Sequence, residues 1–102
     1  MGVEVRLEDE AGKEIACIGD PKGLIVRALP DPNEARFPWA GTIDWYGDTT
    51  FNRRQAELLR KEWAILIQKA VNEEARRLLQ RVDELLQRCV SDVHLYVKFY
   101  GD

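Results

Sequence analysis

Apolar and polar residues alternate near both ends of the chain. In residues 3–8 valines and a leucine alternate with charged side chains, and residues 93–100 alternate in the same way. A period of two is typical of a β-strand with one buried and one exposed face. A polar turn containing Gly12 follows the first strand, and residues 14–18 then predict the returning strand of a hairpin.

The rest of the first half holds two further predicted strands. Residues 24–29 follow a turn containing Pro21 and are apolar on both sides, which favours a strand in the centre of a sheet. Residues 29–38 hold three of the four prolines and predict a long loop. Residues 39–46 predict a fourth strand, although Gly41 weakens it.

A different period governs the second half. Residues 53–89 contain no glycine or proline, and their apolar residues recur every three or four positions. This spacing predicts amphipathic helices that pack against another layer. We expect the first helix to begin between Thr49 and Arg53, because Asn52 and Gln55 have the spacing of a capping box.

This segment can form one helix or two. A single helix over residues 53–89 would be about 55 Å long, which is too long for one small domain. The apolar stripe slips between Ala70 and Ala75, and Asn72 followed by two glutamates is typical of a helix N-terminus. We therefore favour a helical hairpin that is broken near residues 70–73, with a continuous helix as the alternative.

Together these elements predict a single α+β domain over residues 1–102, with the order β-β-β-β-α-α-β. The sheet would have about five strands, antiparallel or mixed, with a two-helix layer on one face. Trp63 belongs to the apolar stripe of the first helix and is expected in the core. Tyr96, Tyr100 and Trp45 would lie on the other face of the sheet, which is rather aromatic for a surface in contact with solvent.

Composition and charge narrow the classes of function. The chain is 45% hydrophobic and 32% charged, which is typical of a folded globular protein. Its net charge is −3, and the acidic excess lies in residues 1–50 while residues 53–88 are mildly basic. Because the chain has no basic run and its pI is about 5.2, we expect no binding to nucleic acid.

Signals for targeting and for metal binding are also missing from the sequence. No apolar run approaches the roughly 20 residues of a membrane span, and no signal peptide opens the chain. We therefore expect a cytoplasmic protein without membrane contact and with reduced thiols at Cys17 and Cys89. His94 is the only histidine, so neither a metal nor another cofactor is expected.

Residues 41–55 are the first candidate for a chemical site. Asp44 and Asp48 lie on either side of Tyr46, and two carboxylates in one pocket can act as acid and base. A hydrolase or an isomerase would use these three residues for catalysis. The candidate ligand-binding residues beside them are Trp45, Asn52 and Arg53.

The same stretch also has a purely structural interpretation. Asp48 would cap the first helix, and Asp44 would begin the bend that leads to it. A third alternative is an anion held by the backbone amides of residues 47–50 at the helix entrance. The spaced glycines and the lysine of a phosphate loop are absent, which weakens this third alternative.

His94 and Cys89 are the remaining candidates for catalysis. His94 lies on the polar side of the last predicted strand, where it could act as a general base. Cys89 precedes it by five residues on the apolar stripe of the second helix. The alternative for Cys89 is therefore an inert position in the core.

Aromatic residues favour a function in association. Trp39, Tyr96 and Tyr100 are the candidate interface residues, because aromatic side chains beside polar ones are frequent in interfaces. We expect a small binding module that forms a homo-oligomer and that has a protein partner or a small-molecule ligand. The alternatives are a small enzyme built on residues 44–48, and an immunity or antitoxin-like protein that neutralises a partner.

Two stretches, Asp44–Gln55 (DWYGDTTFNRRQ) and His94–Asp102 (HLYVKFYGD), resemble a group of small, uncharacterised bacterial proteins. Proteins of this kind are also carried on mobile integron gene cassettes. The resemblance covers most of the chain and the order of its elements, and it implies a bacterial and cytosolic origin. It implies no substrate and no catalytic residue.

Overall fold

The computed structural model describes residues 2–101, which form an antiparallel sheet and a helical layer and so confirm the predicted α+β class. In chain order the elements are β1 (Glu4–Asp9), β2 (Glu14–Ile18), α1 (Leu24–Ala28), the short 3-10 helix η1 (Ala40–Thr42), β3 (Asp48–Phe51), α2 (Arg53–Gln68), α3 (Glu73–Val90) and β4 (Leu95–Tyr100). The predicted five strands and their order are wrong, because residues 2–101 contain four strands in the order β-β-α-β-α-α-β.

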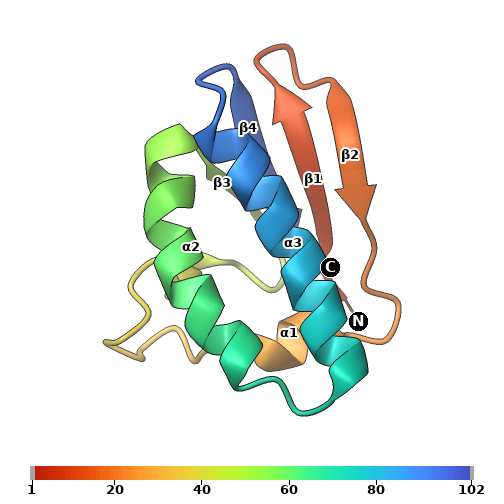
Figure 1. Ribbon diagram of the computed structural model, residues 1–102, viewed down its shortest axis with the longest axis vertical. Helices are drawn as coiled ribbons and strands as arrows, with labels where there is room; N and C mark the ends of the chain where they lie inside the picture. Colours follow the sequence, from red (N-terminus) through yellow and green to blue (C-terminus); the bar gives the residue numbers. More distant parts are fainter. Residues whose placement is uncertain (1, 102) are drawn as a thin grey trace.

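The sheet pairs the first strand with the last. Its strands lie in the order β2-β1-β4-β3, and every neighbouring pair is antiparallel. Figure 1 shows α2 and α3 lying together across one face of this sheet, with α1 beside the turn that joins them. Of the described helices, α1 packs on α3 and η1 packs on α2, so all of them belong to the same side of the sheet.

The core between the two layers is built around Trp63 of α2, as its place on the apolar stripe predicts. The Trp63 side chain is fully buried, and its indole Nε1 donates a hydrogen bond of 2.8 Å to the carbonyl oxygen of Leu79 in α3. Its ring lies 5.8 Å from that of Phe99 in β4, and Phe99 in turn meets Phe51 of β3 edge to face at 5.7 Å. One aromatic cluster therefore joins both helices to the sheet.

The helical hairpin is confirmed, together with both of its caps. Asn52 and Gln55 form the capping box at the start of α2, and the Asn72 side chain accepts the N–H of Ala75 at the start of α3. The bidentate pair of Arg60 and Asp83, with Nε 2.9 Å from Oδ1, links the two helices side by side. Within residues 2–101 no helix combines the length and the apolar character needed to cross a bilayer.

Residues 24–29 form a helix where a central strand was predicted. The carboxylate of Asp20 is buried and accepts the backbone N–H groups of residues 24, 25 and 26 at 2.7, 3.0 and 3.3 Å. Gly23 takes the left-handed conformation, with φ 68°, that turns the chain into α1. The helix buries or half-buries the apolar residues of this segment. A segment that is apolar on both sides therefore did not need to be a strand in the centre of the sheet.

Residues 39–46 also differ from the prediction, because they form η1 and a bend in place of a fourth strand. The carboxylate of Glu62 in α2 is buried and accepts the N–H groups of Trp39 and Ala40 at 3.1 and 2.8 Å. These two amides would otherwise be free to join a sheet. The strand begins only at Asp48, where the chain reaches the edge of β4.

Candidate functional site

Asp44 organises the loop that was the first candidate for a chemical site. Its carboxylate accepts the backbone N–H of Tyr46 at 2.8 Å, and its own N–H donates to the hydroxyl of Thr49 at 2.9 Å. A side chain at Gly47 would lie 2.7 Å from the same carboxylate. The loop therefore has the geometry of an Asx turn, in which an aspartate bonds to the backbone two residues on.

The residues that follow this loop also have structural partners. Asp48 opens β3 and lies 4.0 Å from the ammonium group of Lys98 on β4. Asn52 caps α2 through its side chain, which accepts the N–H of Gln55 at 2.9 Å. The Nε of Arg53 donates to the carbonyl oxygen of Val90 at 2.8 Å, which satisfies the last turn of α3.

The structure divides the predicted site between two separate hollows. Asp44, Trp45 and Tyr46 line one hollow of about 350 Å³, and the Tyr46 side chain is 67% exposed. Asn52 and Arg53 line another, of about 420 Å³, beside Tyr96. Neither hollow unites the two carboxylates with the arginine, so their joint action as a catalytic group receives no support from this arrangement.

His94 and Cys89 lie in different surroundings. His94 precedes β4, is exposed, and has its Nδ1 3.0 Å from a carboxylate oxygen of Glu10 in the β1–β2 turn. Cys89 is fully buried with its Sγ 3.3 Å from the carbonyl oxygen of Leu95, and burial raises the pKa of its thiol to about 11. A protonated thiol in the core is a poor nucleophile, as the structural interpretation of Cys89 predicts.

Trp39 and Trp45 are half-buried, and both pack against the edge of the core. Trp39 belongs to the loop that Glu62 holds against α2, and Trp45 lies in the Asx turn. Neither tryptophan reaches the sheet face on which Trp45 was expected. Of the predicted aromatic residues, that face carries Tyr96 and Tyr100.

The most organised group of polar side chains lies on the face of the sheet that the helices leave uncovered. We call this surface the open sheet face. Strand pairing places Arg6 opposite Lys98 on one side and Cys17 on the other, and Glu8 opposite Tyr96. Its residues are Glu4, Arg6, Glu8, Glu14, Cys17, Asp48, Thr50, Tyr96, Lys98 and Tyr100.

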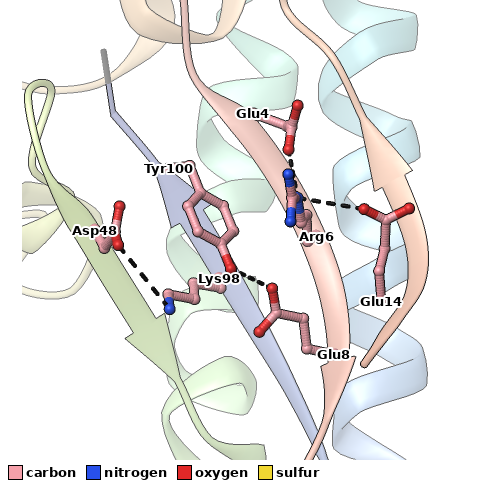
Figure 2. A network of polar contacts seen from close by, with 7 residues as sticks. All are labelled: Glu4, Arg6, Glu8, Glu14, Asp48, Lys98 and Tyr100. Atoms are coloured by element: carbon pink, nitrogen blue, oxygen red, sulfur yellow. Dashed lines mark hydrogen bonds and ion pairs between the residues drawn. The ribbon is translucent and has the colours of Figure 1, made fainter. Parts of the chain in front are cut away.

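Tyr100 is the centre of this surface. Figure 2 shows its ring lying between the strands, with its hydroxyl directed at Glu8. The hydroxyl donates a short hydrogen bond to the Glu8 carboxylate, which is only 7% exposed, and this bond raises the pKa of Tyr100. The guanidinium of Arg6 and the ammonium of Lys98 lie 4.6 and 4.8 Å from the ring centroid, within the range of cation–π attraction.

Arg6 also organises the side of the open sheet face near β2. Its Nε pairs with the carboxylate of Glu4 and lies 3.3 Å from that of Glu14. Glu4, Glu14 and Cys17 lie close enough together to be compared with a metal site. Burial, followed by the charges of Glu4 and Glu14, raises the pKa of the Cys17 thiol, and the guanidinium of Arg6 already pairs with both carboxylates. The two carboxylates and the protonated thiol therefore fit an arginine as their partner better than a metal ion.

The open sheet face is suited to binding more than to catalysis. Its acids and bases are paired with one another, and its tyrosine hydroxyl is held as a donor to a carboxylate. The sequence contained a usable signal for it, since Glu4, Arg6 and Glu8 alternate with the core residues Val5 and Leu7 of β1. Only the pairing of β1 with β4 brings these three residues beside the tyrosines, and that pairing has no local signature.

Comparison with known proteins yields no relative that would assign this surface. No family model, no curated protein and no solved structure matches the chain. The resemblance of residues 44–55 and 94–102 to small bacterial proteins, and the origin that it implies, therefore stay predictions. A function has to be inferred from the geometry of the open sheet face itself.

Proposed function

We propose that the protein is a small binding module that associates with a second copy of itself through the open sheet face. One observation carries the proposal: this face presents two tyrosines among paired charges of both signs, and no helix in residues 2–101 packs on it. Aromatic side chains held in place by neighbours lose little freedom on binding, which favours their use in an interface.

The distribution of charge suits a twofold arrangement. The bases Arg6 and Lys98 lie on the two central strands together with the acids Glu4 and Glu8 of β1, and further acids flank them at Glu14 on β2 and Asp48 on β3. In an isologous dimer the same patch meets itself after a rotation of 180°. Such a rotation can place Arg6 and Lys98 of each copy against acids of the other, so the same surface serves as both sides of the interface.

The edges of the sheet are less suitable for association than its face. The pairing of β2 with β1 shifts register between Leu7 and Glu8, and such a bulge twists an edge strand away from new partners. The other edge, β3, has only four residues and begins with Asp48. Short and charged edge strands discourage pairing between sheets, which favours contact through the open sheet face.

The association is expected to join monomers that are already folded. The accessible surface of 5951 Å² is close to the roughly 5,900 Å² expected for a compact monomer of this mass. Strands about 4.8 Å apart, with residues spaced by about 3.3 Å, give the open sheet face an area on the order of 400 Å². Two faces would bury on the order of 800 Å², which is typical of a weak interface.

Light scattering coupled to size-exclusion chromatography tests the proposal over a range of protein concentrations. We expect dimers to accumulate at high micromolar concentration, and Thr50→Arg to abolish them, because Thr50 lies on the open sheet face opposite Lys98. Gln80→Arg, on the exposed side of α3, introduces the same charge and should leave the dimer intact. A clean monomer at high micromolar concentration, or a dimer sensitive only to Gln80→Arg, would contradict the proposal.

A further inference from the structure

A hollow of about 390 Å³ lies on the helical side of the molecule, away from the open sheet face. It opens where α1, the loop of residues 30–37 and the turn between α2 and α3 come together. Figure 1 shows this region at the end of the helical layer, where the turn between the long helices passes beside α1. Its volume falls within the range of about 300–1,000 Å³ that is typical of small-molecule sites.

The inner surface of this hollow is apolar. Phe37, Leu66 and Ala75 are almost fully buried there, with 4, 6 and 3% of their surface exposed. Val71 lies in the turn at the rim and is 88% exposed, the largest exposed fraction among the large apolar residues described. The half-buried residues that complete the apolar lining are Leu24, Ala28, Pro30 and Ala70.

Two positive charges at the rim are free of ion pairs. Neither Arg27 nor Lys69 forms one with another of the residues 2–101. The ammonium group of Lys69 lies 5.9 Å from the centroid of the Phe37 ring, above the apolar floor. The Nη2 of Arg27 donates to the carbonyl oxygen of Lys22 at 2.7 Å, which fixes the guanidinium while other N–H groups stay available.

The other charges of the rim are largely engaged. Arg36 binds Glu34, with Nε 3.2 Å from Oε1, and this hydrogen bond lowers the pKa of the Glu34 carboxyl, to which the more distant charge of Lys69 adds a smaller effect. The pair is therefore neutral as a whole. Asp31 accepts the backbone N–H of Asn33 at 2.8 Å and remains as a single acid. The rim thus retains an excess of one positive charge over an apolar floor.

We propose that this hollow binds a small organic anion, whose apolar body lies on the floor and whose charged head pairs with Arg27 and Lys69. The ligand class follows from two complementary features. An apolar floor favours a body of hydrocarbon or aromatic character. Two unpaired cations at the rim favour a carboxylate or a phosphate over a neutral head. The site is independent of the association proposed above.

Titration monitored by NMR tests the proposal with octanoate, octyl phosphate and 1-octanol as probes. We expect at least one anion to bind at least tenfold more tightly than 1-octanol, with amide shifts concentrated at residues 28–37 and 66–75. The stronger of the two anions identifies the head group as carboxylate or phosphate. Equal binding of 1-octanol, or shifts spread over the whole chain, would overturn the proposal.

Three variants distinguish the contact of the charged head group with Lys69 from the contact of the apolar body with the floor of the hollow. Lys69→Gln should weaken binding of the anion about tenfold, and Ala70→Leu should abolish it by filling the hollow while the fold is retained. Lys61→Gln, which removes an exposed lysine of α2 outside this hollow, is the matched control and should change affinity less than twofold. Unchanged binding in Ala70→Leu would place the anion elsewhere and contradict the proposal.

Two further measurements test whether a peptide, in place of a small molecule, occupies the hollow and whether anion binding depends on association. A short peptide with a C-terminal leucine carboxylate should bind more weakly than the better anion, and tighter binding of the peptide would reject a small molecule as occupant. Thr50→Arg, which is directed at the open sheet face, should leave anion binding unchanged. Loss of anion binding in that variant would show that the hollow depends on the dimer, against the independent site proposed.

Discussion

At the scale of single residues, two buried carboxylates determine where the chain turns. Asp20 and Glu62 are 6 and 8% exposed, and both accept backbone N–H groups from segments that would otherwise have free amides. Asp20 begins α1, and Glu62 fastens the loop before β3 onto α2. Charged side chains are rarely buried without such partners, so these two positions are structural determinants.

Glu62→Ala tests this role. Removing the carboxylate leaves the amides of Trp39 and Ala40 without their acceptor in a buried setting. We expect the free energy of unfolding to fall by about 1–3 kcal/mol in urea denaturation. Glu57→Ala, on the exposed side of the same helix, is the control and should stay within about 0.5 kcal/mol of the parent protein. Equal effects of the two substitutions would count against the role of Glu62.

Cys89 predicts a specific dependence of stability on pH. Burial raises the pKa of its thiol from 9.0 to about 11, so the unfolded chain loses this proton at lower pH than the folded protein does. The contribution is complete below pH 9 and is lost as the pH rises to about 11. Two pKa units correspond to about 2–3 kcal/mol.

Equilibrium unfolding at several pH values between 8 and 11 measures this loss. Other groups titrate in the same range, so the comparison is made with Cys89→Ala, which lacks the thiol but keeps the rest of the chain. The stability of the parent protein should fall more steeply with pH than that of the variant. Parallel pH profiles for the two proteins would be inconsistent with a buried, protonated thiol.

At the scale of elements, the sequence predicted what depends on neighbouring residues. The β1–β2 hairpin, the capping box at Asn52 and the break before Glu73 each have a local pattern, and each is confirmed. α1 and η1 depend on side-chain acceptors that the apolar pattern does not show: Asp20 lies four to six residues before the amides that it accepts, and Glu62 lies more than 20 residues after those of Trp39 and Ala40. Local propensity favoured a strand in residues 24–29 and 39–46, but the hydrogen bonds to Asp20 and Glu62 stabilise helical turns there.

The same distinction applies to the candidate site. Residues 44–53 are rich in polar and aromatic residues because they form a turn and a helix cap, and the hydrogen bonds of Asp44 and Asn52 serve these two structures. Tyr96 and Tyr100 were placed on an exposed face by the period of two, and the structure agrees. Their partners Arg6 and Glu8 could not be predicted, because strand pairing across the chain was unknown.

Gly101 shows how tightly the loop before β3 fits against the end of β4. Its N–H donates to the carbonyl oxygen of Gly47 at 2.7 Å, and a Cβ there would lie 2.6 Å from backbone atoms of three loop residues. We expect Gly101→Ala to displace the loop and to lower the free energy of unfolding by about 1–3 kcal/mol.

Thermal unfolding with a matched glycine tests this expectation. At Gly41 the nearest atom to an added Cβ would be 3.5 Å away, which is an ordinary contact. Gly41→Ala should therefore leave the melting temperature close to that of the parent protein, while Gly101→Ala lowers it by several degrees. A melting temperature unchanged in both variants would show that the loop moves aside without lowering the stability of the protein.

At the scale of the whole molecule, the two faces of the sheet carry different kinds of residues. One face carries the aromatic core that holds the helices, and the other carries paired charges and tyrosines that no helix of residues 2–101 covers. The hollow proposed to bind an anion lies on the helical side, at the far end of α2. The proposed interface and the proposed anion site use different surfaces, so neither would exclude the other.

The two cysteines supply a built-in measure of association. Cys17 is exposed on the open sheet face, whereas Cys89 is buried, so alkylation of the native protein modifies Cys17 first. We expect the rate of Cys17 alkylation per molecule to fall as the protein concentration rises into the range where dimers form. Mass spectrometry after quenching measures this rate.

Thr50→Arg is the control for this labelling experiment, because its Cys17 should react at the same rate at every concentration. The raised pKa of Cys17 slows the reaction equally in all samples at one pH. A concentration-independent rate in the parent protein, despite dimers seen by light scattering, would place the contact away from Cys17.

The pairing of β1 with β4 has a consequence for the order of folding. The two strands meet in the middle of the sheet, yet more than 80 residues separate them along the chain. Closing a loop of that length costs about 4 kcal/mol of chain entropy, compared with about 1–2 kcal/mol for a short hairpin. During synthesis on the ribosome β1 has only β2 as a strand partner until β4 emerges, and β3 has none, so three of the four strands can join one sheet only when the last strand is made.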